Sequence, residues 1–273
     1  MRKILFIICW ALAGVGLYSC SLDEPSYGKT TSDNYYQKES DIEQALTGAY
    51  LQLRTTWNEY ALNHYFVGDC STDDALKGGG NDGDRAEVRD LSDFTIYTTN
   101  GEVGRRWEIL YRLINRCNDV IYYAPDAIGN EELLKRYANE AKALRAFGYY
   151  CLVTTFGEVP LITTPMQPAE ILQIPRSPLE KVYECIVNDL TDASALPAKG
   201  DYSEGDAYRA TRGFAKTMLA KTFSTILPEL TMDEMLEISK IYSISGLLTK
   251  QMPLITQRPF RTVHHTASSV SIV

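Results

Sequence analysis

The spacing of apolar residues predicts a chain built from helices. Between Leu134 and Thr155, apolar and small residues recur at steps of three and four positions, so they share one face of a helix over residues 131–156. Gly157 follows the last turn, where a left-handed residue closes a helix, and Pro160 prevents the helix from resuming. We therefore expect a long helix that ends at Gly157 and leaves as an extended segment through Val159 and Ile162.

The same spacing predicts further helices over residues 41–54, 102–123, 178–196 and 208–223, and an amphipathic helix within residues 231–250. We expect Ser40 or Asp41 to cap the first of them, and Pro125 to end the second. Residues 55–102 lack sustained periodicity, and so long an irregular insertion is either functional or mobile. The predicted fold class is all-α, with helical hairpins similar to tetratricopeptide units and one irregular loop insertion.

The first 19 residues have the pattern of a bacterial lipoprotein signal peptide. Arg2 and Lys3 precede an apolar run that ends at Leu17, which is too short to span a bilayer. A small residue, Ser19, then precedes Cys20, which we expect to become the acylated N-terminus. An ordinary secretory signal that is cut elsewhere is the alternative. Acyl chains on Cys20 would anchor the protein without a spanning helix, and the polar residues 20–40 would form a surface tether.

The charge balance argues against nucleic acid or an anionic membrane surface as a partner. The chain has 35 acidic and 27 basic side chains, and removal of the signal peptide would make its net charge of −8 more negative. Its 45% hydrophobic residues are typical of a globular protein that buries a core. Tyrosine is frequent, with 18 residues, which suits sugar contacts and helix packing alike.

The cysteines and histidines indicate neither a metal site nor a cofactor. Cys70, Cys117, Cys151 and Cys185 form no CxxC pair, and the last three lie on predicted core faces, so we expect buried thiols, although three disulfide pairings are open. The three histidines lack the spacing of a helical zinc site.

Six blocks of sequence, taken in order behind the lipoprotein signal, resemble the SusD/RagB-like family of glycan-binding outer-membrane lipoproteins. Together they cover nearly everything up to Phe223. The blocks are Ala45-Leu46-Thr47-Gly48-Ala49-Tyr50; Gly68-Asp69 with Asp73; Trp107, Tyr111, Ile114 and Asn118 at their spacing on one helix; the L-R-A-x-x-Y-Y and F-G-E-V-P-L order within 144–161; Arg176-Ser177 with Val182-Tyr183 and Asp189-Leu190; and Arg209 to Ala215 with Ala220-Lys221.

The resemblance implies a helical, tetratricopeptide-like domain over residues 41–223 and a non-enzymatic role. In that role the protein captures oligosaccharide or polysaccharide at the surface of the outer membrane and delivers it to a TonB-dependent SusC-like porin. Members of the family normally continue through a larger C-terminal region, whereas residues 224–273 depart from the pattern. We therefore expect a divergent tail in a truncated or frame-shifted product.

The resemblance also implies ligand contacts at Tyr97 and Asn100, because this stretch of the family often carries an aromatic residue and an asparagine that face sugar. An aromatic ring stacks on the C–H face of a pyranose, and an amide bridges two hydroxyls. The alternative is a plain β-strand, since Phe94, Ile96 and Thr98 alternate.

Two other classes of function remain open from the residues. Asp69, Asp73 and Asp74 offer the paired carboxylates that a glycosidase needs, and a scaffold that binds only the porin needs no sugar site at all. The glycine-rich loop with Asp82 and Asp84 has oxygens suited to calcium, but neither acidic group has a complete motif. We expect the remaining prominent side chains to be structural, with Arg145 paired to a buried acid or a backbone carbonyl; they are Trp107, Tyr111, Arg145 and Arg212.

Overall fold

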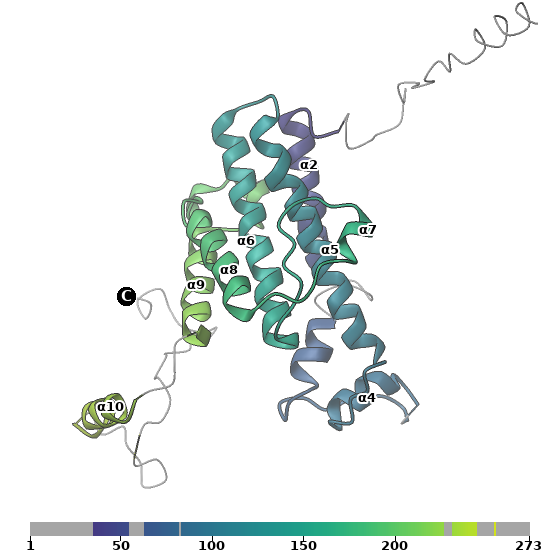
Figure 1. Ribbon diagram of the computed structural model, residues 1–273, viewed down its shortest axis with the longest axis vertical. Helices are drawn as coiled ribbons and strands as arrows, with labels where there is room; N and C mark the ends of the chain where they lie inside the picture. The colour runs from purple at the N-terminus through teal and green to yellow at the C-terminus, as the bar shows by residue number, and fades with distance from the viewer. Residues whose placement is uncertain (1–34, 55–62, 82, 227–230, 245–253, 255–273) are drawn as a thin grey trace, which may run out of the picture. The chain divides into compact units, whose positions relative to one another are not determined.

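The computed structural model describes residues 35–54, 63–81, 83–226, 231–244 and 254, and this part of the chain is helical, with no β-strand. The all-α prediction is therefore confirmed. The principal helices are α2 (Glu39–Tyr50), α5 (Gly101–Tyr123), α6 (Glu131–Phe156), α8 (Leu179–Ala193), α9 (Arg212–Ile226) and α10 (Met232–Ile244), shown in Figure 1. Shorter pieces are η1 (Leu51–Leu53), η2 (Tyr65–Asp69), α4 (Ala86–Ser92), η3 (Ala124–Asp126), α7 (Pro168–Ile171), η4 (Lys199–Asp201) and η5 (Glu204–Asp206).

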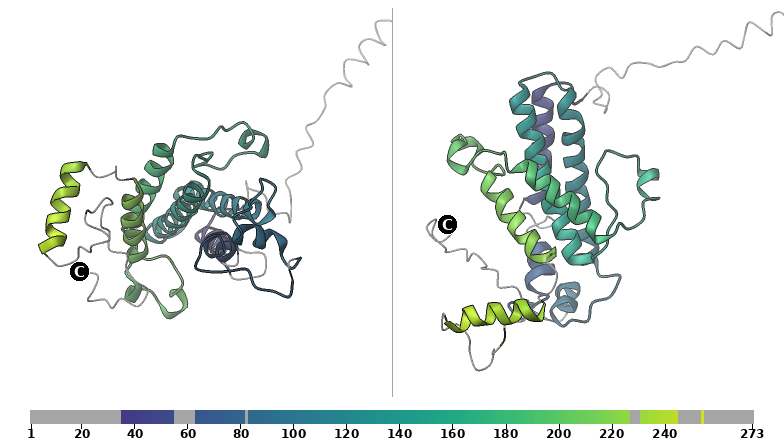
Figure 2. Two further views of the ribbon diagram at one scale, coloured as in Figure 1. Left: turned by 90° about the horizontal axis from the view of Figure 1, so that it is seen from below. Right: turned by 60° about the vertical axis from the view of Figure 1, so that its left-hand side comes forward.

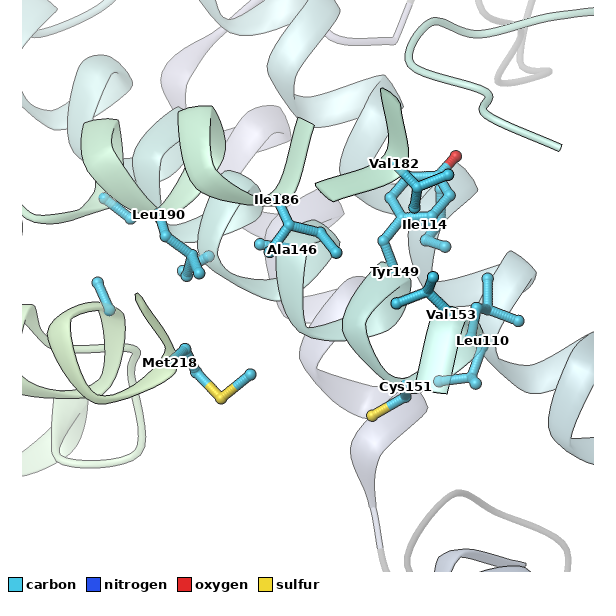
Figure 3. Packing of buried hydrophobic residues seen from close by; sticks show 14 of the residues in the cluster. Leu110, Ile114, Ala146, Tyr149, Cys151, Val153, Val182, Ile186, Leu190 and Met218 are labelled. Carbon is cyan, nitrogen blue, oxygen red and sulfur yellow. The ribbon is translucent and has the colours of Figure 1, made fainter. Parts of the chain in front are cut away.

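Helix α6 is the central element, because α5, α8 and α2 all pack against it. Its buried residues occupy most of its circumference, as expected for a helix with neighbours on several sides. Buried apolar side chains of α5, α6, α8 and α9 form one core, part of which is shown in Figure 3. A second core joins α2 to α5 and the first half of α6, and includes Ile42, Leu46, Leu113 and Tyr137.

A glycine permits the close approach of α5 and α6. A methyl group at Gly148 of α6 would lie 3.0 Å from Cγ1 of Ile114 on α5, which is tighter than ordinary van der Waals contact. Each of the two helices begins at an asparagine whose side chain accepts two backbone N–H groups of the first turn; the residues are Asn100 and Asn130.

The predicted end of α6 is confirmed. Gly157 has a φ of 72°, a region that favours glycine, and its N–H bonds to the carbonyl of Val153. The segment that follows runs back along the helices and is held by side chains at three points. Tyr111 donates to the carbonyl of Pro160 at 2.7 Å, Asn118 donates to the carbonyl of Ile162 at 2.9 Å, and Tyr149 donates to that same carbonyl at 2.8 Å.

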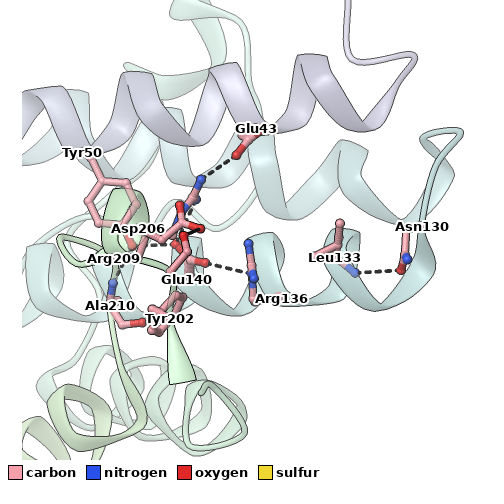
Figure 4. Close-up of polar contacts among 11 residues, drawn as sticks. Glu43, Tyr50, Asn130, Leu133, Arg136, Glu140, Tyr202, Asp206, Arg209 and Ala210 are labelled. Atoms are coloured by element: carbon pink, nitrogen blue, oxygen red, sulfur yellow. Dashed lines mark hydrogen bonds and ion pairs between the residues drawn. The ribbon is translucent and has the colours of Figure 1, made fainter. Parts of the chain in front are cut away.

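A buried network of charged groups joins α2, α6 and the loop before α9 (Figure 4). The guanidinium of Arg209, only 2% exposed, lies 2.6 Å from Glu43, 2.6 Å from Asp206 and 3.4 Å from Glu140. Tyr50 of α2 donates to Glu140 at 2.8 Å and accepts the N–H of Ala210 at 2.8 Å. Burial raises the pKa of the Glu140 carboxyl, and the two arginines beside it oppose that shift.

Three sequence-based expectations need correction at element ends. The first helix begins at Glu39 with Lys38 as its N-cap, and Asp41 instead sits at the third helical position, where it accepts the N–H of Lys38 at 3.0 Å. The last helix of the matched region begins at Arg212 rather than Tyr208, because the preceding residues are held in the loop by the Arg209 network. Residues 94–100 form turns and no strand.

Candidate functional site

The candidate site is a turn, residues 93–99, that joins α4 to α5. Helix α4 is anchored by Val88 and Leu91, which are 2% and 1% exposed. The chain then reverses through Phe94, a non-glycine residue with a φ of 56°. The turn is closed by the N–H of Thr95, which donates to the carbonyl of Asp90 at 2.9 Å, and by the N–H of Asn100, which donates to the carbonyl of Tyr97 at 3.0 Å.

This turn presents three large apolar side chains to solvent within four residues. Phe94 is 68% exposed, Ile96 is 48% exposed and Tyr97 is 66% exposed. Single exposed apolar residues are common on protein surfaces, whereas a contiguous group indicates a binding surface. The sequence pointed to Tyr97 as a ligand contact and left a strand through Phe94 and Ile96 as the alternative, which the structure does not form. Their alternation was the wrong signal, and the nearby polar run Thr98-Thr99-Asn100 is the signal of a turn that leads into a helix cap.

Asn100 connects the turn to both helices, and most of the hydrogen-bonding capacity of its side-chain amide is already used. Its side-chain oxygen accepts the N–H groups of Glu102 and Val103 at 3.1 and 3.2 Å, and its NH₂ donates to the carbonyl of Glu87 at 2.9 Å. The residue is only 6% exposed. The structure therefore places Asn100 and Tyr97 at one turn but in different surroundings, with the ring outside and the amide inside.

A buried carboxylate in the first turn of α5 stabilises the end of the turn at residues 93–99. Glu102, in the first turn of α5, lies 3.4 Å from Arg85 and 3.9 Å from Arg105. Asn63 donates to its backbone carbonyl at 2.8 Å. An acidic group at a helix N-terminus is favoured by the helix dipole, so this arrangement stabilises the start of α5 and with it the Asn100 cap.

The acidic residues considered for catalysis lie at the end of η2 and in the chain that follows it. Asp69, Asp73 and Asp74 are exposed. The acid of a glycosidase usually lies in an apolar pocket beside the scissile bond, and these exposed carboxylates lack such a pocket. Asp84 is exposed in the glycine-rich loop, and Asp82 lies outside the described residues.

The expected lipidation site, Cys20, also lies outside the described residues, as do the signal peptide and nearly all of the tether. Within the described part of the chain, none of the helices combines the length and the apolar character that a bilayer-spanning segment requires.

Comparison with known proteins assigns the helical part of the chain to a family. Residues 21–223 match the model of the SusD-like family described as "Starch-binding associating with outer membrane", and the chain belongs to this family. SusD-like protein P2 of Formosa agariphila is 29% identical over 228 residues, which are 82% of this chain and 43% of that protein.

Solved structures of SusD-like proteins have the same fold. A laminarin-binding SusD-like protein superposes with a TM-score of 0.61 at 28% identity, covering 78% of this chain and 43% of that one. Surface glycan-binding protein A from Bacteroides uniformis gives a TM-score of 0.60 at 25% identity, covering 76% of this chain and 44% of that one. The chain thus spans less than half the length of the relatives that it matches.

The end of the chain resembles a different family. Residues 209–273 match the model described as magnesium chelatase, subunit ChlI. The uncharacterized protein YifB of Salmonella typhimurium is 46% identical over 61 residues, which are 22% of this chain and 12% of that protein. This identity is higher than the 29% of the SusD-like relative named above, whose match extends over 228 residues.

Proposed function

We propose that the mature protein captures a glycan at the cell surface, without catalysis, and passes it to a TonB-dependent SusC-like porin. Membership of the SusD-like family supports this function, as do structural relatives described as binding laminarin or surface glycans. The observation that carries the proposal is the rigid turn at residues 93–99, which holds Phe94, Ile96 and Tyr97 in solvent. Exposed rings on a fixed backbone stack on sugar at little cost in conformational entropy.

Within this turn, Tyr97 is the proposed sugar contact. Its exposed ring offers a face for a pyranose, and its hydroxyl adds a hydrogen-bonding group at the edge. Asn100 serves the site by positioning, because its oxygen and one N–H are committed to the backbone of α5 and α4. Only the second N–H of its amide remains for a direct contact with sugar.

We place the protein at the outer membrane through acyl chains on Cys20. The family description associates its members with the outer membrane, and the sequence around Cys20 has the lipoprotein pattern. Two or more acyl chains give stable attachment without a spanning helix. Radiolabelled palmitate incorporated by the wild-type chain and not by Cys20→Ala is the expected result.

We assign the segment from residue 224 onward to a different gene of origin. The sequence predicted a truncated or frame-shifted product, and that remains a prediction. Translation in a wrong frame does not produce 46% identity to another protein over 61 residues, so the match favours a joined segment over a frame shift. Genomic sequence across the codons for residues 209–230 in related strains tests this, since a join predicts that the SusD-like reading frame continues elsewhere.

Affinity gel electrophoresis of residues 21–273 tests the proposed function, with gels that contain laminarin, soluble starch or other polysaccharides. We expect retardation by at least one glycan, loss of most of it in Tyr97→Ala, and retention in Tyr97→Phe, which keeps the ring. Tyr122→Ala is the matched control, because Tyr122 is 55% exposed near the other end of α5. Equal retardation of Tyr97→Ala and wild type would remove the turn from the site, and no retardation by any glycan would contradict the proposed function.

A further inference from the structure

A second pocket on α5 combines aromatic rings with unused polar groups. It lies between α5 and the segment that carries α7, which Figures 1 and 2 show on the long loop after α6, outside the helical bundle. We call it the α5–α7 pocket. It has a volume of about 370 Å³, and its principal lining residues are Trp107, Tyr111, Asn115, Ile162, Ile171 and Leu172. This volume lies within the range typical of small-molecule sites.

Two walls of the α5–α7 pocket, the one on α5 and the one formed by residues 160–162, are held in place by packing and hydrogen bonds. The Trp107 ring lies 4.8 Å from that of Tyr111 and 5.1 Å from that of Phe156, measured between centroids. Tyr111 and Asn118 tie the opposite wall to α5 through the carbonyls of Pro160 and Ile162. These two walls are therefore preformed, so a ligand does not have to order them.

Two polar groups in this pocket have no partner. Within the described part of the chain, neither the indole N–H of Trp107 nor the side-chain amide of Asn115 makes a hydrogen bond, and neither group is fully buried. Asn115 lies one turn beyond Tyr111 and two turns beyond Trp107, so the three residues follow one face of α5. Trp107 is half-buried and Asn115 is exposed, so the hydrogen-bond partners of both groups come from the solvent or from a ligand.

From this combination we propose that the α5–α7 pocket is a second glycan subsite, which takes one pyranose unit. A pyranose has an apolar C–H face for the Trp107 and Tyr111 rings and hydroxyls for the two unpartnered groups. An apolar side chain of a protein partner would fill the same space but leave both groups unsatisfied, which is unfavourable. This inference rests on the proposed glycan-binding function and adds a position to it.

The subsite lies well away from the turn at residues 93–99. At a rise of 1.5 Å per residue, Trp107 and Asn115 lie about 9 Å and about 21 Å along the axis from the start of α5 at Gly101. A single sugar ring cannot contact both positions. Two subsites on one long glycan increase its apparent affinity through effective concentration. We therefore expect polysaccharides to bind more tightly than disaccharides of the same linkage.

Trp107 reports on its own pocket. Trp57→Phe leaves Trp107 as the only tryptophan in residues 21–273. Its fluorescence emission can then be followed as laminarihexaose or maltohexaose is added. We expect one of these sugars to change the emission, and the change to persist in Tyr97→Ala. Asn115→Ala is expected to weaken that titration about three- to tenfold, as for loss of one hydrogen bond. Asn188→Ala, at an exposed asparagine of α8, is the matched control.

The outcomes separate the subsite from the proposed function. Retardation that depends on Tyr97, with constant Trp107 emission and with Asn115→Ala equal to wild type, would overturn the subsite and leave glycan binding intact. A change in emission that Asn115→Ala weakens would support the subsite whether or not Tyr97 contributes. Neither retardation nor any emission change with either sugar would contradict both proposals.

Discussion

Arg145 and Asp189 form a doubly hydrogen-bonded ion pair in the core, with Nε and Nη2 of the arginine each 2.8 Å from a carboxylate oxygen. The remaining nitrogen of Arg145, Nη1, donates to the side chain of Asn118 at 3.0 Å and to the carbonyl of Thr163 at 2.9 Å. One guanidinium on α6 thus joins α5, α8 and the segment after Gly157. The arrangement uses the planar fork of arginine, which lysine cannot reproduce.

Removal of one partner of this pair is expected to destabilise the protein strongly. Asp189→Asn leaves the charge of Arg145 buried without compensation, and such changes cost about 3–5 kcal/mol. Urea unfolding followed by circular dichroism measures the loss. The control is Glu108→Gln, which removes an exposed ion pair with Arg112 whose side chains are 70% and 50% exposed; its expected cost is below about 0.5 kcal/mol. A similar loss in both variants would show that burial does not govern the effect.

Gly157 and Gly104 are expected to respond to alanine with opposite signs. Neither position has an atom within 4 Å of an added methyl group, so packing does not decide the outcome. Gly157 has a φ of 72°, which alanine adopts only with strain, so Gly157→Ala is expected to cost about 1 kcal/mol or more. Gly104 lies within α5, where alanine is favoured by about 0.5–1 kcal/mol. Thermal unfolding of both variants tests this, and destabilisation of both would contradict the backbone argument.

The free thiols are expected to be unreactive in the folded protein. Cys117 is fully buried, and burial raises the pKa of its thiol far above the usual range; burial also raises the pKa of Cys185 to about 12. Because the thiolate is the reactive form, a thiol reagent at pH 8 should label residues 21–273 slowly in buffer and rapidly in urea. Fast labelling of Cys117 in buffer, located by mass spectrometry, would contradict this packing.

The raised pKa of the Cys117 thiol makes the free energy of unfolding depend on pH. Above the pKa of an unfolded thiol, about 8.5, the unfolded chain releases a proton that folded Cys117 retains. The free energy of unfolding should therefore fall as the pH rises from 8 to 9.5, and Cys117→Ala should reduce that slope. An unchanged slope in the variant would assign the effect to other groups.

Helix positions were predictable from the sequence where a periodic apolar face is followed by a residue that ends a helix, such as glycine. Helix α6 begins at Glu131 and ends at Phe156, the bounds that periodicity and Gly157 predicted. The partner of Arg145 was predicted only by class, as a buried acid or a carbonyl, because no local pattern relates positions 145 and 189. Such contacts depend on how helices pack, and periodicity reports only which face is buried.

The candidate site was less predictable for a related reason. Alternation at Phe94, Ile96 and Thr98 is typical of a strand, yet no neighbouring strand is present among the described residues to pair with it. The sequence suggested Asn100 as a sugar contact through its amide. In the structure that amide caps α5 and bonds to the carbonyl of Glu87 instead. The Trp107 helix was interpreted as structural, and the unpartnered groups of the α5–α7 pocket became visible only with the exit segment in place.

Asn100 offers a direct test of whether capping or sugar contact explains its position. Asn100→Ala removes the cap of α5 and its bond to Glu87, and is expected to cost about 1 kcal/mol. Asn100→Ser keeps a capping oxygen and lacks the amide, so it should recover most of that loss in thermal unfolding. If the residue acts by positioning, Asn100→Ser also keeps retardation in the affinity gel close to that of wild type. A serine variant that is stable but binds as poorly as Tyr97→Ala would instead show that the second N–H of Asn100 reaches the sugar.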